Sequence, residues 1–73
     1  MDETMEDKVK IARNFAEVLK MTEAYSELRG LTYAKTDDDE FVLAEFQNGR
    51  TKKINVRLDS GIAMIKDIIR GLE

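Results

Sequence analysis

The chain contains no histidine, cysteine, proline or tryptophan among its 73 residues. Histidine and cysteine are the side chains that most often act as general base, nucleophile or soft metal ligand near neutral pH. Without an imidazole, Ser26 and Ser60 lack their usual activating base, and the four glycines are isolated rather than gathered in a phosphate-binding loop. We therefore expect a protein that is not an enzyme and that holds no cofactor and no metal ion.

The chain also lacks segments that direct a protein to a membrane. No apolar run approaches the roughly 20 residues that span a bilayer. Residues 1–4 are acidic in character, whereas a signal peptide begins basic and then becomes apolar. The net charge of −3 provides no general attraction to nucleic acid or to an anionic membrane. These absences predict a cytoplasmic protein that binds no membrane and no small-molecule substrate.

The residues that are present suit a small folded domain, since 42% are hydrophobic and 37% are charged. The length allows a single domain over residues 1–73. A chain this short buries only about 60% of the surface that its unfolded form exposes, and neither a disulfide nor a metal is expected to supplement its core. Association with a second copy is a usual source of stability for such small domains, so we expect a homodimer.

A long helix is predicted over residues 5–29. Thr4 can cap its start, with Asp7 completing a capping box, and Gly30 can end it as a left-handed residue. Its broad, mostly apolar stripe comprises Val9, Ile11, Ala12, Phe15, Ala16, Val18, Leu19, Thr22 and Tyr25. A second, shorter helix is predicted after Ser60, which caps it. The stripe of that helix comprises Ile62, Ile65, Ile68, Ile69 and Leu72.

Three short strands are predicted between the helices, over residues 31–36, 41–47 and 51–58. The dipeptide Asn48-Gly49 tolerates the positive φ values of a two-residue type I′ turn and predicts a hairpin. That turn places Leu43 opposite Ile54, and it defines a core face for the hairpin. The predicted core face comprises Phe41, Leu43, Ile54, Val56 and Leu58.

The length of the first loop decides which way the first strand turns its apolar residues. An odd-length loop puts Leu31 and Tyr33 with the predicted core, and an even-length loop puts them on the opposite face. We prefer the odd length because it gathers the apolar residues together. The predicted fold class is α+β in the order α-β-β-β-α: a three-stranded antiparallel meander packed with a long N-terminal helix and a short C-terminal helix. The pattern leaves open which face each helix covers.

Two apolar surfaces remain uncovered in this predicted arrangement. A helix of about 24 residues spans about 36 Å, whereas the strands span about 20–24 Å, so the first helical turns overhang the sheet. The second strand is apolar on both faces, although a sheet that faces water on one side usually alternates. The residues predicted to carry self-association or partner contact are Met5, Val9, Ala12, Val42, Ala44 and Phe46. The alternative is a monomer in which the two helices cover every apolar surface.

Four consecutive acids, Asp37, Asp38, Asp39 and Glu40, lie between the first two predicted strands. The run lacks the alternating ligands and the central glycine of a calcium-binding loop, so a metal site is disfavoured. As a solvated loop it is expected to steer a basic partner, or to imitate the charge of a run of phosphates.

The basic cluster lies around the third predicted strand and comprises Arg50, Lys52, Lys53 and Arg57. It has no interleaved aromatic side chain for stacking on bases. Lysines on an edge strand discourage unwanted strand pairing, and this protective role is the favoured interpretation. A weak nucleic-acid binder that uses these residues is the alternative.

The functional prediction is a non-catalytic interaction domain, homodimeric, that binds and regulates or inhibits another protein. In size, acidic charge and lack of catalytic residues the chain is similar to short acidic proteins of bacterial mobile elements, among them phage-encoded inhibitors such as anti-CRISPRs. That similarity implies a second hypothesis. In it, the protein is a DNA mimic whose acidic loop occupies the nucleic-acid-binding site of a partner.

Overall fold

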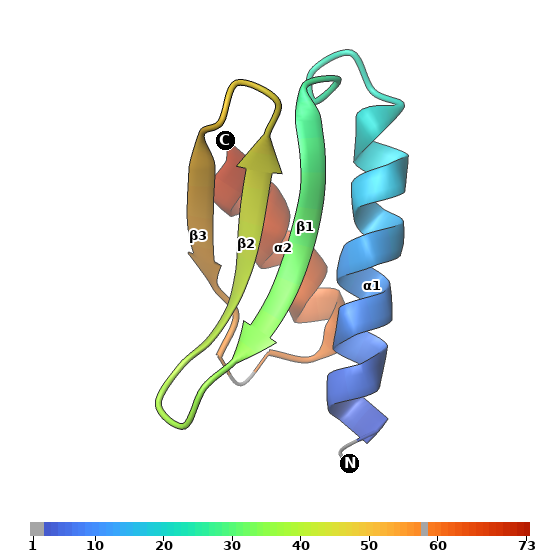
Figure 1. Ribbon diagram of the computed structural model, residues 1–73. Helices are drawn as coiled ribbons and strands as arrows, with labels where there is room; N and C mark the ends of the chain where they lie inside the picture. The colour runs from blue at the N-terminus through green and yellow to red at the C-terminus, as the bar shows by residue number, and fades with distance from the viewer. Residues whose placement is uncertain (1–2, 58) are drawn as a thin grey trace.

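The computed structural model describes residues 3–57 and 59–73, with side chains described from residue 7 onward. Two helices and three strands follow one another in the order α-β-β-β-α (Figure 1). They are α1 (Glu3–Lys20), β1 (Leu28–Lys35), β2 (Glu40–Phe46), β3 (Thr51–Asn55) and α2 (Gly61–Leu72). The strands form an antiparallel sheet in the order β1-β2-β3, which confirms the predicted α+β meander.

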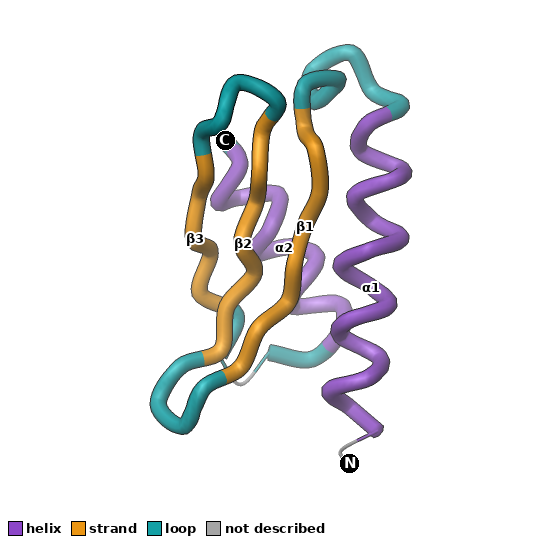
Figure 2. The backbone as a smooth tube through the Cα atoms, viewed as in Figure 1, coloured by secondary structure: helices purple, strands orange, loops and turns teal. Residues whose placement is uncertain are grey.

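Both helices pack on the same face of the sheet, so the protein has two layers. In Figures 1 and 2, α2 runs behind the sheet, and α1 lies alongside β1. The contacts agree, because α1 packs on β1 and α2, whereas α2 packs on β3 and α1. The buried core comprises Ala12, Ala16, Leu19, Leu28, Leu31, Tyr33, Val42, Ala44, Ile54, Val56, Met64, Ile68 and Leu72. Within the described chain, no helix covers the other face of the sheet, which is termed the open face.

Helix α1 ends at Lys20, well before the predicted residue 29. The Thr22 hydroxyl donates a hydrogen bond to the carbonyl oxygen of Leu19 at 2.6 Å, and the Thr22 backbone N–H donates to the same oxygen at 3.0 Å. These bonds satisfy a carbonyl group that the end of the helix leaves without an intrahelical partner. The chain then passes through turns before β1 begins.

Two predicted end signals of the first helix are wrong. Gly30 lies within β1, beside an irregular register between Leu28 and Gly30. Thr4 lies inside α1, which begins at Glu3. The helix has 18 residues and therefore spans about 27 Å. This shorter length removes most of the predicted overhang, and Ala12 is fully buried.

The β2–β3 hairpin turns through three residues rather than two. The backbone N–H of Gly49 donates to the carbonyl oxygen of Phe46 at 3.0 Å, and Gly49 adopts a φ of 88°. A tight turn followed by a left-handed glycine is the usual three-residue hairpin loop, and Asn48-Gly49 suits it as well as a type I′ turn. The pairing therefore shifts by one residue, and Val42 lies opposite Ile54.

This shift exchanges the two faces of β2. Val42 and Ala44, predicted on the outer face, are fully buried in the core. Phe41 and Leu43, predicted in the core, are partly exposed on the open face. A one-residue change of register moves every side chain of a strand to the other face. The last predicted core residue, Leu58, lies outside the described residues.

The loop between β1 and β2 has an even length, so the preferred odd length is wrong. It runs from Thr36 to Asp39, and the Asp39 backbone N–H donates to the Thr36 hydroxyl at 3.0 Å. Leu31 and Tyr33 are nevertheless buried, because β2 also presents its other side to the core. They lie opposite the two fully buried residues of β2.

Helix α2 begins at the predicted cap, since the Ser60 hydroxyl accepts a hydrogen bond from the Ala63 backbone N–H at 3.3 Å. Its buried stripe comprises Met64, Ile68 and Leu72. Gly71 packs directly on Ile54 of β3, where an added Cβ atom would lie 2.7 Å from the Ile54 Cγ1 atom. Lys52 donates from Nζ to the Gly71 carbonyl oxygen at 3.2 Å. These contacts hold α2 against the edge strand of the sheet.

Candidate functional site

Large hydrophobic side chains are exposed on the helix side of the molecule. Within residues 7–57 and 59–73 they are Val18, Met21, Ile62 and Ile69, with exposed fractions of 56%, 86%, 67% and 39%. Val18 lies on α1, Met21 directly follows it, and the two isoleucines lie on α2. A single exposed apolar residue is ordinary, but a concentration of them on one side of a domain indicates a contact surface.

Each helix carries more apolar residues than its buried side accommodates. Beside the buried stripe of α1 runs a second stripe, which comprises Ile11, Phe15 and Val18. Beside the buried stripe of α2 runs another, which comprises Ile62, Ile65 and Ile69. The spacing of three or four residues keeps each second stripe on one side of its helix. None of these six residues is fully buried.

A groove with a volume of about 480 Å³ follows the second stripe of α1. This helix groove is lined by Asp7, Lys10, Ile11, Asn14, Phe15, Val18 and Ile65. The two helices touch at one end of α2, where a Cβ atom on Gly61 would lie 2.9 Å from the Ile11 Cδ1 atom. The helix groove therefore combines residues of both helices, and most of its apolar lining comes from α1.

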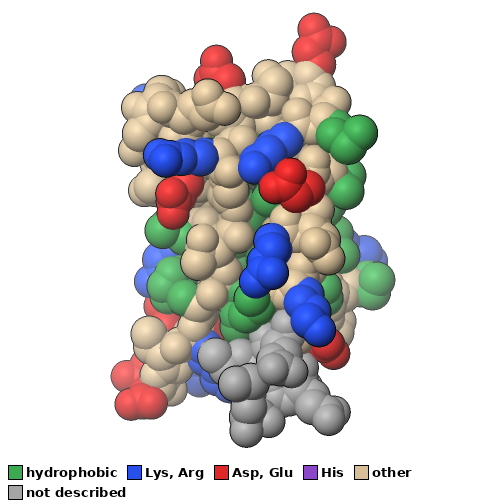
Figure 3. Space-filling view, turned by 45° about the vertical axis from the view of Figure 1, so that its right-hand side comes forward, with side chains coloured by type: hydrophobic (Ala, Val, Ile, Leu, Met, Phe, Trp, Pro, Cys, Tyr) green, Lys and Arg blue, Asp and Glu red, His purple; other side chains and the backbone are tan. Residues whose placement is uncertain are grey.

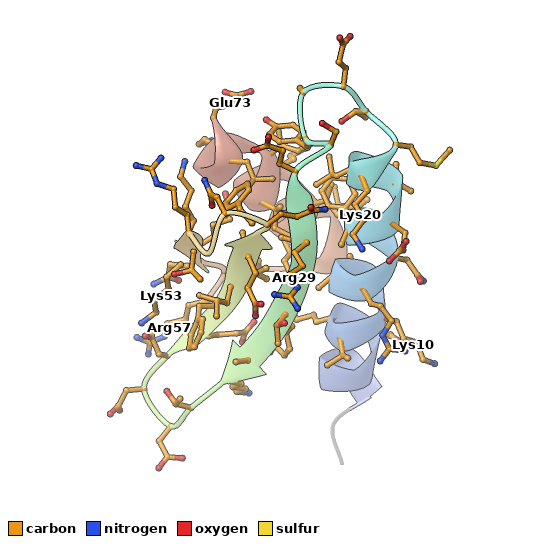
Figure 4. All side chains as sticks on the ribbon, turned by 45° about the horizontal axis from the view of Figure 1, so that its top comes forward. Lys10, Lys20, Arg29, Lys53, Arg57 and Glu73 are labelled. Carbon is orange, nitrogen blue, oxygen red and sulfur yellow. The ribbon has the colours of Figure 1, made fainter. Side chains whose placement is uncertain are left out.

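Charged side chains of both signs border the helix groove. Lys10 and Glu17 are seven residues apart, which is close to two helical turns, so they lie on the same flank of α1. The Glu17 side chain is 69% exposed and accepts a hydrogen bond from Lys20 Nζ at 3.1 Å. In Figure 4, Lys10 lies on the side of α1 that is turned away from the sheet. Figure 3 shows basic and acidic side chains interspersed with hydrophobic ones on the face in view.

A second unusual feature is a group of charged side chains where α1, β2 and α2 meet. Lys8 of α1 and Glu40 of β2 form an ion pair whose side chains are only 6% and 9% exposed. Lys8 Nζ also lies 5.9 Å from the centroid of the Tyr33 ring. The charges of this pair act on Asp59, and so does the carboxyl group of Asp67 of α2. Lys8, Glu40, Asp59 and Asp67 are termed the charge cluster.

The carboxyl group of Asp59 is poorly accommodated when it is ionised. Its Oδ2 atom is buried and has no hydrogen-bond partner. Interaction of the protonated carboxyl with Asp67, burial and the negative charge of Asp67 together raise the pKa of Asp59 to about 6. Lys8 acts in the opposite direction and lowers this pKa. The charge cluster can therefore bind a proton under mildly acidic conditions.

The charge cluster does not form a metal site in the part of the chain that the structure describes. No three acidic side chains there converge in an arrangement that could hold a metal ion. The cluster links α1 to β2 through the Lys8–Glu40 ion pair. Its other two carboxylates, Asp59 before α2 and Asp67 within α2, lie close enough to each other to shift the pKa of Asp59. The charge cluster can gain or lose a proton at Asp59, close to where α1, β2 and α2 meet.

The predicted association residues are not brought together on a surface. Three of them are fully buried: Ala12, Val42 and Ala44. Val9 and Phe46 are partly buried against the same core, and the side chain of Met5 lies outside the described residues. The predicted position of the β2 residues on an outer face is therefore wrong, because the hairpin register differs by one residue.

The acidic loop divides into separate environments. Asp37 and Asp38 are exposed, whereas Glu40 is buried in its ion pair. Asp39 accepts a hydrogen bond from Lys53 Nζ at 2.7 Å. That hydrogen bond holds the pKa of Asp39 below its ordinary value. Only half of the predicted steering loop therefore presents unpaired acids to solvent.

The basic residues of the third predicted strand are also separated. Lys53 lies on the open face, where its Nζ atom is 4.6 Å from the centroid of the Phe41 ring. Lys52 reaches the end of α2 on the other face. In Figure 4, Lys53 and Arg57 lie near each other beside β3. Arg50 is exposed at the end of the β2–β3 turn. Because Lys52 lies on the other face, the four predicted basic residues do not form one continuous patch.

Sequence reasoning assigned the apolar residues of the groove to the buried stripes of the helices, although Ile11, Phe15 and Ile65 are only partly buried and Val18 is exposed. The predicted stripe of the first helix is wider than one sheet can cover, and this excess width is the signal for a second apolar side. The charge cluster had no comparable signal. Lys8 and Glu40 are 32 residues apart in sequence, and only the tertiary fold brings them together.

Comparison with protein-family models, with curated proteins and with solved structures finds no match to this chain. In the described residues, neither helix is both long enough and apolar enough to cross a membrane. Among the described residues, we infer a function from the helix groove.

Proposed function

We propose that this protein is a non-catalytic interaction domain that forms a homodimer through its helix layer and, as a dimer, binds and regulates or inhibits another protein. The observation that carries the proposal is the position of the exposed large hydrophobic residues. Those on regular elements, Val18, Ile62 and Ile69, all lie on the two helices, and Val18 lines the helix groove. A location in the cytoplasm belongs to the same proposal.

A second copy of the chain is the occupant that this surface favours. The core of so small a domain is thin, and burial of the second stripes of both helices against another chain would extend it. Lys10 lines the helix groove, and Glu17 lies on the same flank of α1, seven residues further along. An identical surface related by a two-fold axis can therefore provide the opposite charge at each position.

The two alternative functions receive less support. A DNA mimic needs a continuous acidic surface, but Asp39 and Glu40 are each paired with a lysine. A nucleic-acid binder needs a continuous basic surface, but Lys52 and Lys53 lie on opposite faces of the sheet. Neither charged segment offers the uninterrupted array that recognition of phosphates, or imitation of them, requires.

Light scattering behind size exclusion tests the homodimer directly, over a tenfold range of protein concentration. We expect the wild-type protein to have twice the 8.4 kDa mass of one chain. Val18→Glu and Ile62→Glu each place a charge on the exposed apolar surface of a helix, and both are expected to reduce the mass to that of one chain. The cause is the cost of burying an unpaired charge in an interface.

Thr32→Glu is the matched control, because Thr32 is exposed on the open face of the sheet. We expect this variant to remain dimeric. A wild-type mass of 8.4 kDa at every concentration would contradict the proposal. So would a dimer that survives both substitutions on the helices.

A further inference from the structure

We infer that the two copies join through antiparallel α1 helices, with the two-fold axis beside Asn14 and with Lys10 of each copy paired to Glu17 of the partner subunit. This inference rests on the proposed homodimer and names the residues that set its register. It concerns the α1 side of the helix groove, where most of the lining residues lie.

The groove side of α1 carries residues that repeat every seven positions. The three pairs are Ile11 and Val18, Asp7 and Asn14, and Lys10 and Glu17. Five of these six residues line the helix groove, and Glu17 lies on the same flank as Lys10. A seven-residue repeat allows two helices to pack along a common seam, with the first two pairs in the seam and the third beside it.

We place the two-fold axis beside Asn14, with the two helices antiparallel, because this arrangement brings matching residues of the two seams together. It places Ile11 of one copy against Val18 of the partner subunit, and it does so twice by symmetry. The contact covers Val18, which is 56% exposed in the single chain. Asn14 then faces Asn14 of the partner subunit, and two amide groups can hydrogen-bond to each other. A matched polar pair in the seam favours one register over its neighbours.

Lys10 and Glu17 distinguish the antiparallel arrangement from the parallel one. In antiparallel helices the same flank of each helix meets across the seam, so Lys10 faces Glu17 of the partner subunit. Parallel helices bring opposite flanks together and place Lys10 near the flank that carries Phe15. In that arrangement Lys10 has no acidic side chain opposite it. Charge complementarity therefore favours the antiparallel dimer.

The ion pair within α1 is compatible with this arrangement. Glu17 Oε1 accepts from Lys20 Nζ at 3.1 Å, on an exposed surface. A carboxylate can accept several hydrogen bonds through its two oxygens, so Glu17 can contact Lys20 in its own chain and Lys10 of the partner subunit together.

Charge reversal tests the register. Lys10→Glu puts two acids in contact, and Glu17→Lys puts two bases in contact, in each case at both symmetric positions. We expect each variant alone to raise the dimer dissociation constant about tenfold. An equal mixture of the two variants restores opposite charges at both positions. We therefore expect the dimer mass to return on mixing, at a concentration where each variant alone has the mass of one chain.

Lys20→Gln is the control, because it removes the pair within α1 and leaves Lys10 and Glu17 unchanged. We expect this variant to dimerise like the wild type. A mixture of charge-reversed variants that stays monomeric, or single variants that remain dimeric, would overturn the register while leaving the homodimer intact. A monomeric wild-type protein would instead overturn the homodimer itself, so the two failures are distinguishable.

Discussion

Helix α1 has two apolar sides that meet different surroundings. On the side that faces the sheet, three residues are buried by the chain's own core: Ala12, Ala16 and Leu19. On the side of the helix groove, Val18 is 56% exposed, and Ile11 and Phe15 are partly buried. The first side contributes mainly to the stability of the single chain, whereas the second is available to another molecule. Substitutions on two sides of one helix can therefore separate folding from association.

The largest effect is expected on the sheet side of α1, from Lys8→Met. This change leaves Glu40 buried without its partner, and an unpaired buried charge typically costs about 3–5 kcal/mol. Urea denaturation would measure the loss as a decrease in the free energy of unfolding. The double variant Lys8→Met/Glu40→Leu removes both charges and is expected to recover most of that loss. A cost below about 1 kcal/mol for the single variant would mean that the ion pair does not hold α1 to the sheet.

An intermediate effect is expected from Asp59→Asn, through its dependence on pH. The folded-state pKa of Asp59 is raised from 3.8 to about 6, so the folded chain binds this proton more tightly than the unfolded chain. The resulting stabilisation is complete below about pH 4 and is lost as the pH rises through 6. Because Asp59 is partly exposed and solvent screens its interactions, we expect the wild-type free energy of unfolding to fall by less than about 1 kcal/mol between pH 5 and pH 7.5.

The Asp59→Asn variant should show a flatter profile over the same range, because asparagine does not titrate. Asp39, whose pKa is lowered, titrates below this window and does not affect the comparison. Urea denaturation at several pH values measures both proteins. Parallel profiles for wild type and variant would show that Asp59 is not the group responsible.

The smallest effect on stability is expected on the groove side of α1, from Val18→Ser. The side chain is 56% exposed, and exposed substitutions usually change the free energy of unfolding by no more than about 0.5 kcal/mol. The measurement is made on dilute protein, where dimers do not contribute to stability. The same variant is expected to weaken dimerisation at higher concentration. A large loss of stability in the dilute monomer would show that the two sides of α1 are not separable.

The elements of the fold were predictable because each has a strong local signal. Ser60 caps α2 as expected, and the hairpin forms at Asn48-Gly49. The register was not predictable, because that dipeptide fits both a two-residue and a three-residue loop. The pattern in β2 does not choose between them, since Val42 and Phe41 are both apolar. Tertiary packing against the helices decides which face is buried.

The site was only partly predictable, for a related reason. The apolar positions of both helices were identified, but their spacing does not say which of them the sheet covers. Val18 and Ile62 belong to the predicted stripes, yet they are 56% and 67% exposed. The angle at which a helix lies on a sheet decides this, and that angle depends on contacts such as Gly71 on Ile54. Local sequence carries little information about such contacts.

The placement of both helices on one face of the sheet has a consequence for the shape of any dimer that they form. Two chains joined through their helix layers make four layers, with the helices inside and the two sheets outside. The open faces then point in opposite directions, so the dimer is bivalent for any ligand that binds a sheet face. A target that carries two copies of such a ligand would be held by avidity, at an effective concentration set by the spacing between its copies.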